Sequence, residues 1–257
     1  MDLDLKGRSV IVTGASRGIG HAIATEFARE GARLTICART AGPLEEAAAR
    51  LTAETGAEVQ AVACDVTDPA SAELIVNAAV QSYGSIDALV NNAGGSTRSD
   101  DLDTRWLGTF DANVRSIVRI MLAAKPHLAQ AVANGGGAVV NIASIYGRES
   151  GGGPEYNSMK SGQIAMSKAY ALDWAREGIR VNTVAPGSIA FEGGGWGRRL
   201  VEQPEVMREF IEHNIPSGRF GRVDEIANVV VFLCSPRASW VLGASINVDG
   251  GQSRSNI

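Results

Sequence analysis

Short apolar, mostly β-branched runs alternate with longer amphipathic segments along nearly the whole chain, and this alternation limits the fold more than any other feature. The expected strands are 9–14, 33–39, 58–66, 86–94 (with its loop), 135–144, 179–187 and 244–250. Helices are expected at 21–32, 42–56, 68–84, 101–133, 154–178 and 224–236. Repeated strand–helix–strand units with short apolar strands predict an α/β fold, a doubly wound parallel sheet with helices on both faces.

The chain of 257 residues is long enough for one large α/β domain or two small ones. It contains no linker-like stretch and no internal repeat, so we expect a single domain over residues 1–257. The least regular part is 187–218, which is rich in glycine at first and is then interrupted by proline. Long irregular segments in compact domains are often functional lids. We therefore expect a substrate lid at about 188–217.

Composition excludes several classes of function. Hydrophobic residues make up 45% and charged residues 20%, and the net charge is −4 with no block of Lys and Arg, which argues against a nucleic-acid partner. No stretch approaches the roughly 18 apolar residues of a membrane helix. The first residues, "MDLDLKGRSVIVTG", do not resemble a signal peptide, because acidic residues precede the short apolar run.

The potential metal ligands are scattered. Cys37, Cys64 and Cys234 are far apart in the sequence and odd in number, which is typical of reduced, buried thiols rather than of a disulfide or metal set. The three histidines are equally dispersed, so we expect no metal site. A cytoplasmic location follows from these observations.

The sequence "TGASRGIG" (13–20) lies between the first strand and the first helix. Gly14, Gly18 and Gly20 allow a tight turn in which backbone N–H groups approach a pyrophosphate at a helix N-terminus. Alone, such a turn could be an ordinary loop, but the strand–turn–helix context favours dinucleotide binding. Ser16, Arg17 and Ile19 belong to the same turn and are further candidates for cofactor contacts.

The end of the second strand indicates which dinucleotide is bound. An NAD site usually places an acidic residue there, for the ribose 2′-hydroxyl. This chain has Ala38 and Arg39 instead, and Arg17 lies in the glycine turn. Two guanidinium groups suit a 2′-phosphate by charge and geometry. We expect NADP(H) to be preferred over NAD(H), although Arg39 could also be a solvated strand end.

The run "GGGPEYNSMKSG" (151–162) passes from glycines into a helix that carries Tyr156 and Lys160. Pro154 suits the first turn of a helix. Residues four apart share a helix face, so the Lys160 ammonium is expected to lie beside the Tyr156 phenol and to lower its pKa. Such a pair is usually an ordinary surface pair, so by itself it indicates little.

Together, several motifs resemble the short-chain dehydrogenase/reductase family over about residues 5–252. They are "TGASRGIG", "NNAG" (91–94), Ser144, "YNSMK" (156–160), "NTVAPG" (182–187) and "INVDGG" (246–251). The resemblance implies a Rossmann-like domain with a seven-stranded sheet, and Tyr156 as the general acid/base beside Ser144, Lys160 and Asn113. It also implies that Ser144 hydrogen-bonds the substrate oxygen, that Lys160 holds the nicotinamide ribose, and that Asn113 holds a water molecule behind Lys160.

The resemblance further implies a set of cofactor contacts. These are Asp65 and Val66 beside the adenine, Asn92, Ala93 and Gly94 lining the cofactor, and Pro186, Gly187 and Ile189 beside the nicotinamide. The family often has a threonine shortly after "PG", which contacts the nicotinamide carboxamide. This chain has Ala190 and Phe191 there, and Ser188 could substitute.

The substrate is not identified by the sequence. Candidate pocket residues are Ser96, Tyr146, Arg148, Glu149, Phe191 and Trp196. Trp196 lies between glycines that could act as hinges. It could cap an apolar substrate or simply pack at the surface. Arg148 could pair with an anionic substrate, with Glu149 or with a partner subunit.

Three functions remain open. The first is an NADP(H)-dependent reductase that interconverts a ketone or aldehyde and an alcohol. The second is a 3-oxoacyl-carrier-protein reductase, for which Arg198 and Arg199 could offer a basic surface. The third is a non-catalytic NADP-binding or scaffold protein, against which the full set of catalytic residue types argues. The family is commonly tetrameric, so the resemblance implies a homotetramer, with contacts through 101–133, 154–178 and 224–250.

Overall fold

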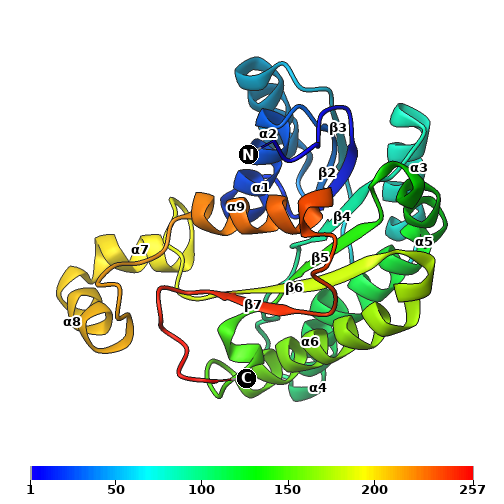
Figure 1. Cartoon of the computed structure of the whole chain (residues 1–257). Coiled ribbons are helices and arrows are strands. Elements are labelled where there is room, and N and C mark those ends of the chain that lie inside the picture. The colour runs from blue at the N-terminus through cyan, green and yellow to red at the C-terminus, as the bar shows by residue number, and fades with distance from the viewer. Residues whose placement is uncertain (1, 257) are drawn as a thin grey trace.

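Seven parallel strands form one sheet in the computed structural model of the chain, which describes residues 2–256 (Figure 1). In spatial order they are β3 (Val59–Ala63), β2 (Arg33–Ala38), β1 (Ser9–Thr13), β4 (Ala88–Asn91), β5 (Ala138–Ile142), β6 (Arg180–Pro186) and β7 (Ser245–Val248). Each neighbouring pair runs parallel. The expected α/β class and seven-stranded sheet are confirmed.

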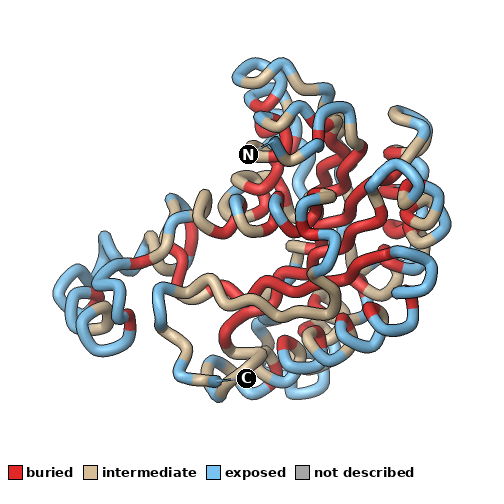
Figure 2. Tube along the Cα trace, in the orientation of Figure 1, coloured by how far each residue is buried: buried red, intermediate tan, exposed pale blue. Residues whose placement is uncertain are grey.

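Helices cover both faces of this sheet. The first face packs against α1 (Gly18–Arg29), α2 (Ala41–Thr55) and α9 (Val223–Cys234), and the second against α3 (Ser71–Tyr83), α5 (Ser116–Ala131) and α6 (Pro154–Trp174). Successive strand residues point to opposite faces, so Val10 and Val12 join the first core and Ile11 the second. The central strands are accordingly buried throughout (Figure 2).

The order of the strands reverses between β1 and β4, because the chain builds outward to β3 before it returns to the centre. In doubly wound sheets, the loops at the carboxyl ends of the strands form a crevice at this reversal. The loops after β1, β4, β5 and β6 all leave from that edge. They carry the glycine turn, the "NNAG" segment, Ser144 and Gly187, which explains why residues far apart in the sequence can share one site.

Two regions differ from the sequence-based expectation. The long helical region expected at about 101–133 is confirmed, but it runs as α4 (Leu102–Phe110), a π turn (Asp111–Arg115) that was not expected, and α5. The irregular segment expected at 187–218 contains two helices, α7 (Gly195–Glu202) and α8 (Pro204–Asn214). Its glycines obscured this pattern, while Pro204 occupies the first turn of α8, where proline is tolerated.

The helices α7 and α8 lie beside the main sheet, at the left of Figure 1. They share a small core of their own, built from Met207, Ile215 and Phe220 with Trp196 and Phe210 packed against it. We call residues 188–217 the lid, as a name for this segment. Ala190 is joined to the region before α9 by a hydrogen bond from its N–H to the Gly221 carbonyl (3.0 Å).

Candidate active site

The glycine turn after β1 forms a cradle of backbone groups. A β-carbon at Gly20 would lie 2.4 Å from both Asn92 Nδ2 and the Gly14 carbonyl oxygen, so only glycine fits there. The helix α1 begins at Gly18 with no side-chain cap and no acidic residue in its first turn. Its free N–H groups and its positive dipole end suit a pyrophosphate. The turn therefore fits a dinucleotide cofactor.

Asn92 holds the loop after β4 against this turn. Its Nδ2 donates to the carbonyl oxygens of Thr13 (2.9 Å) and Gly14 (3.1 Å). The Thr13 hydroxyl in turn accepts from the N–H groups of Asn92 (2.9 Å) and Ala93 (3.0 Å). This pairing fixes two of the predicted cofactor segments relative to one another.

The two predicted phosphate-binding arginines differ in their surroundings. Arg39 is exposed at the end of β2, and its side chain makes no ion pair or hydrogen bond to any other residue within 2–256. Arg17 donates from Nη1 to the Gly193 carbonyl in the lid (3.4 Å). Arg39 is thus available to an anion, whereas Arg17 lies between the glycine turn and the lid.

Asp65 and Val66 follow β3 at the same edge of the sheet. The Asp65 carboxylate accepts from Thr67 through its N–H (2.9 Å) and its hydroxyl (2.8 Å), while Val66 packs against the second core. Cys37 and Cys64, far apart in the sequence, lie close together next to this segment, and each thiol shifts the pKa of the other. The sequence did not predict that contact.

Ser144, Tyr156 and Lys160 come together in one hollow of about 220 Å³. Ser144 follows β5, and its Oγ accepts from the Tyr146 N–H (3.1 Å). The Ser144 hydroxyl also interacts with the Tyr156 hydroxyl and acts to lower its pKa. Tyr156 and Lys160 lie on α6, which begins at Pro154 as predicted. The rest of the lining includes the predicted residues Ile19, Asn92, Gly94, Pro186, Gly187, Ile189 and Trp196. The geometry thus joins the catalytic candidates to several cofactor candidates.

The glycines before α6 make room for neighbouring side chains. A β-carbon at Gly151 would lie 2.1 Å from the Tyr146 ring, and one at Gly153 would lie 2.8 Å from the Glu155 carboxylate. The structure shows that Tyr146, from the same loop, and Glu155, in the first turn of α6, are what they accommodate.

The expected effect of Lys160 on Tyr156 is wrong in this structure. Burial raises the pKa of Tyr156, and this effect exceeds the opposing one of the Ser144 hydrogen bond. Lys160 Nζ lies 5.6 Å from the centre of the Tyr156 ring, and its hydrogen bonds go elsewhere. Burial also lowers the pKa of Lys160 to about 7, so near neutral pH the ammonium form has little advantage over the neutral amine.

Gln163 is a residue at the site that the sequence argument missed. Lys160 Nζ donates to Gln163 Oε1 (2.9 Å) and to the Ile142 carbonyl (2.8 Å), and Gln163 Nε2 donates to the same carbonyl (3.1 Å). Gln163 is fully buried. It continues the helix face of Tyr156 and Lys160 at a spacing of three, which is the signal that could have identified it.

Asn113 is buried in the π turn, and its side chain contacts backbone groups. Its Nδ2 donates to the carbonyls of Gly95 and Thr109 (2.7 Å each), and its Oδ1 accepts from the Gly95 N–H (3.1 Å). The side chain thereby fixes the loop after β4. Lys160 has other partners, so no direct contact links it to Asn113, and the water relay stays a prediction. Single π turns occur often at functional sites.

The six candidate substrate residues lie in different surroundings. Trp196 lines the catalytic hollow. The Tyr146 ring packs on Gly151, and Arg148 Nη1 donates to the Ser245 carbonyl (2.7 Å), which takes it away from Glu149 and from the hollow. Ser96 is exposed, and the Phe191 ring lies against Gly18 in the glycine turn. The Glu149 carboxylate accepts from the Ser253 hydroxyl (3.0 Å) and the Arg254 N–H (2.9 Å). Of the six candidates, Trp196 is the one that the structure places at the wall of the hollow.

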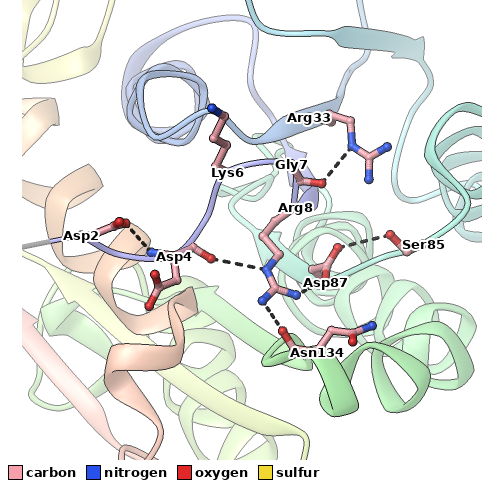
Figure 3. Close-up of a pocket in the computed structure, with 9 residues that line it drawn as sticks. All are labelled: Asp2, Asp4, Lys6, Gly7, Arg8, Arg33, Ser85, Asp87 and Asn134. Carbon is pink, nitrogen blue, oxygen red and sulfur yellow. Dashed lines mark hydrogen bonds and ion pairs between the residues drawn. The ribbon is translucent and has the colours of Figure 1, made fainter.

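A second hollow, of about 470 Å³, lies at the amino ends of the strands (Figure 3). Arg8 Nη1 pairs with Asp87 Oδ1 (3.0 Å) and Arg33 Nε donates to the Gly7 carbonyl (3.0 Å). These cations are therefore engaged in holding the N-terminal segment to the sheet. The hollow contains none of the predicted catalytic residues and lies opposite the crevice.

Comparisons with known proteins agree with this geometry. A family model described as Enoyl-(Acyl carrier protein) reductase matches residues 14–253. The chain is 35% identical to the 3-oxoacyl-[acyl-carrier-protein] reductase FabG of Escherichia coli (strain K12), over 97% of this chain and 98% of that protein. It is also 35% identical to a D-threitol dehydrogenase of Mycolicibacterium smegmatis, covering 97% and 94%.

Among solved structures, the L-sorbose reductase of Gluconobacter frateurii, complexed with NADPH and L-sorbose, superposes with a TM-score of 0.91. The two chains are 33% identical, and the match covers 99% of this chain and 100% of that one.

Proposed function

The chain belongs to the short-chain dehydrogenase/reductase family, and we propose that Tyr156 carries the proton step of its reaction. The protein is an NADP(H)-dependent oxidoreductase that interconverts a ketone or aldehyde and an alcohol. The observation that carries the residue assignment is the single hollow in which Ser144, Tyr156 and Lys160 meet residues of the glycine turn and of the loop after β6.

The proposed chemistry follows from the groups in the hollow. When bound, NADPH supplies a hydride to the carbonyl carbon. The Tyr156 hydroxyl gives its proton to the carbonyl oxygen, which the Ser144 hydroxyl also holds by a hydrogen bond. Because burial raises the pKa of Tyr156, its phenol stays protonated near neutral pH and holds the proton that carbonyl reduction requires.

Three structural features support NADP(H) as the cofactor. The glycine turn leaves the N-terminal N–H groups of α1 free, and Arg39 is an exposed cation without a partner within 2–256. Its planar guanidinium can bind a 2′-phosphate through two hydrogen bonds. No acidic residue occupies the end of β2, where the 2′-hydroxyl of NAD(H) would need one.

The test is a screen of NADPH oxidation with ketones, diketones and acyl thioesters, run in parallel with NADH. We expect turnover with NADPH at a higher kcat/KM than with NADH. Tyr156→Phe should lose at least about a hundredfold in kcat, as removal of a general acid predicts, while NADPH binding stays intact. Activity near that of the wild type in Tyr156→Phe would overturn the assignment.

A second candidate is reduction of a 3-oxoacyl thioester on an acyl carrier protein. It is supported by the 35% identity to the Escherichia coli reductase and by Arg198, which is exposed on α7 of the lid. Arg199 lies over the Trp196 ring instead (5.3 Å), so it contributes less to a basic surface. A kcat/KM for acetoacetyl-carrier protein well above that for small ketones would select this candidate.

We propose that the protein is a cytoplasmic homotetramer. Trp240, just before β7, is 98% exposed, and Leu107 and Leu122 are exposed on α4 and α5, in the regions expected at the interfaces. Cys37, Cys64 and Cys234 are free thiols, as suits a reducing compartment. Within residues 2–256, we find no helix of the length and apolarity that crossing a membrane requires.

A further inference from the structure

Phe191 occupies an unusual place for an aromatic ring. A β-carbon built on Gly18, in the glycine turn, would lie 2.6 Å from Cζ of the Phe191 ring. A β-carbon on Gly194, at the start of α7, would lie 2.9 Å from the same atom. The ring tip is therefore enclosed between two glycines, one from the turn that fits a pyrophosphate and one from the lid.

The segment that carries this ring is joined to the glycine turn. Residues 191–194 form a tight turn in which the Gly194 N–H donates to the Phe191 carbonyl (3.0 Å). Gly193, at φ 74°, provides the left-handed residue in this turn, and its carbonyl accepts from Arg17 Nη1 (3.4 Å). The Arg17 side chain of the glycine turn and the Phe191 ring of the lid thus connect the two segments.

The contact obstructs the start of α1. Gly18 is the first residue of α1, and the N–H groups that follow it have no acidic side chain or cap near them. A pyrophosphate bound by those groups must approach through the space in front of Gly18. An apolar ring there offers no hydrogen bond to a phosphate oxygen and occupies the space in front of Gly18.

We propose that Phe191 is a gate on the pyrophosphate turn: NADP(H) binds only after the ring has left Gly18, and the start of the lid moves with it. The inference rests on the proposed cofactor. Gly194 encloses the ring, so displacement of the ring shifts the start of α7. The helix carries Trp196, which lines the catalytic hollow. Cofactor binding therefore rearranges the wall that contacts the substrate.

The gate weakens the apparent affinity of the protein for NADPH by an amount that can be measured. When the competent conformation is only a fraction of the free protein, the apparent Kd equals the intrinsic Kd divided by that fraction. If the ring lies on Gly18 in about nine-tenths of the free molecules, its removal tightens binding about tenfold. A ring that instead packed over a bound cofactor would weaken binding when removed, so the two possibilities have opposite signs.

The experiment measures the Kd for NADPH by titration calorimetry in the wild type, Phe191→Ala and Phe191→Leu. We expect Phe191→Ala to bind NADPH about tenfold more tightly, and Phe191→Leu to lie between the two because its side chain is smaller but still apolar. Steady-state kinetics should show a lower KM for NADPH. Thermal unfolding of each variant establishes that it is folded.

Val201→Ala is the matched control. Val201 lines the same hollow of about 550 Å³ on the outer side of the lid as Phe191 does, but its side chain is exposed and does not face Gly18. Its Kd should equal that of the wild type. An unchanged or weaker Kd in both Phe191 variants overturns the gate. A wild type that does not bind NADPH refutes the proposed cofactor instead.

Discussion

At the scale of single residues, the Lys160 ammonium donates hydrogen bonds to two oxygen atoms. It is fully enclosed, and Gln163 Oε1 is the side-chain acceptor that meets its ammonium, beside the Ile142 carbonyl. Burial lowers the pKa of Lys160 to about 7, and desolvation is the cause, with no charged neighbour contributing. The ammonium is therefore lost as the pH rises through about 7, and Gln163 opposes that loss.

This predicts opposite effects for two substitutions at Gln163. Gln163→Glu places a carboxylate beside Lys160 and raises its pKa, so the decline of kcat/KM with rising pH should move to higher pH. Gln163→Leu removes the acceptor, lowers the Lys160 pKa and should move the decline to lower pH. The measurement is the pH profile of kcat/KM at saturating NADPH. Shifts of the same sign in both variants would contradict a positioning role.

At the scale of elements, the lid has its own aromatic support. The Trp196 ring stacks on Phe210 of α8 with centroids 4.8 Å apart and lies 5.2 Å from Phe220. The Trp196 side chain also lines the catalytic hollow. The lid core is separate from the two cores of the sheet, so it can be altered without unfolding the sheet.

Phe210→Ala should therefore loosen Trp196 and affect the substrate more than the cofactor. We expect KM for the carbonyl substrate to rise about tenfold while the Kd for NADPH stays within about twofold, since loss of a packed aromatic ring costs a few kcal/mol locally. Val206→Ala, on an exposed position of the same helix, is the control and should change neither value. Equal losses for substrate and cofactor would argue against separate support.

At the scale of the whole molecule, the edge of the sheet at β7 is only partly covered. All four residues of β7 are only half-buried, and Trp240 beside it is 98% exposed. Exposed edge strands and large exposed apolar side chains both mark sites of association. The phosphate-binding and catalytic loops leave from the carboxyl ends of the strands, whereas β7 is the lateral edge of the sheet. Association through β7 therefore leaves the crevice open.

Trp240→Ser should accordingly weaken the assembly without altering the active site. Light scattering at a fixed protein concentration should give a mass of four chains for the wild type and a smaller mass for the variant, with NADPH binding retained. Leu172→Ala, which is exposed on α6, tests the second expected interface in the same way. A monomeric wild type would contradict the homotetramer.

The sequence predicted the features that depend on local pattern. Strand–helix alternation predicted the sheet, and the Ser144, Tyr156 and Lys160 spacing predicted a cluster that the fold assembles. It missed features that depend on packing between distant segments. In the sequence Gln163 looks like any polar helix residue, and only the fold brings it to the Ile142 carbonyl. Phe191 was predicted as a substrate-pocket residue in the place of a threonine, whereas the fold brings its ring to Gly18.

The π turn at Asp111–Arg115 has a consequence for how the chain tolerates change. A π turn holds one residue more than a regular helical turn. Successive residues of a helix are rotated by about 100° about its axis. Deletion of one residue from the π turn would therefore rotate α4 and α5 relative to each other, and either Asn113 or the buried face of α5 would leave its place. Surface loops tolerate insertions and deletions, but we expect the protein not to tolerate them in this π turn, because the number of residues between α4 and α5 sets how the two helices are rotated relative to each other.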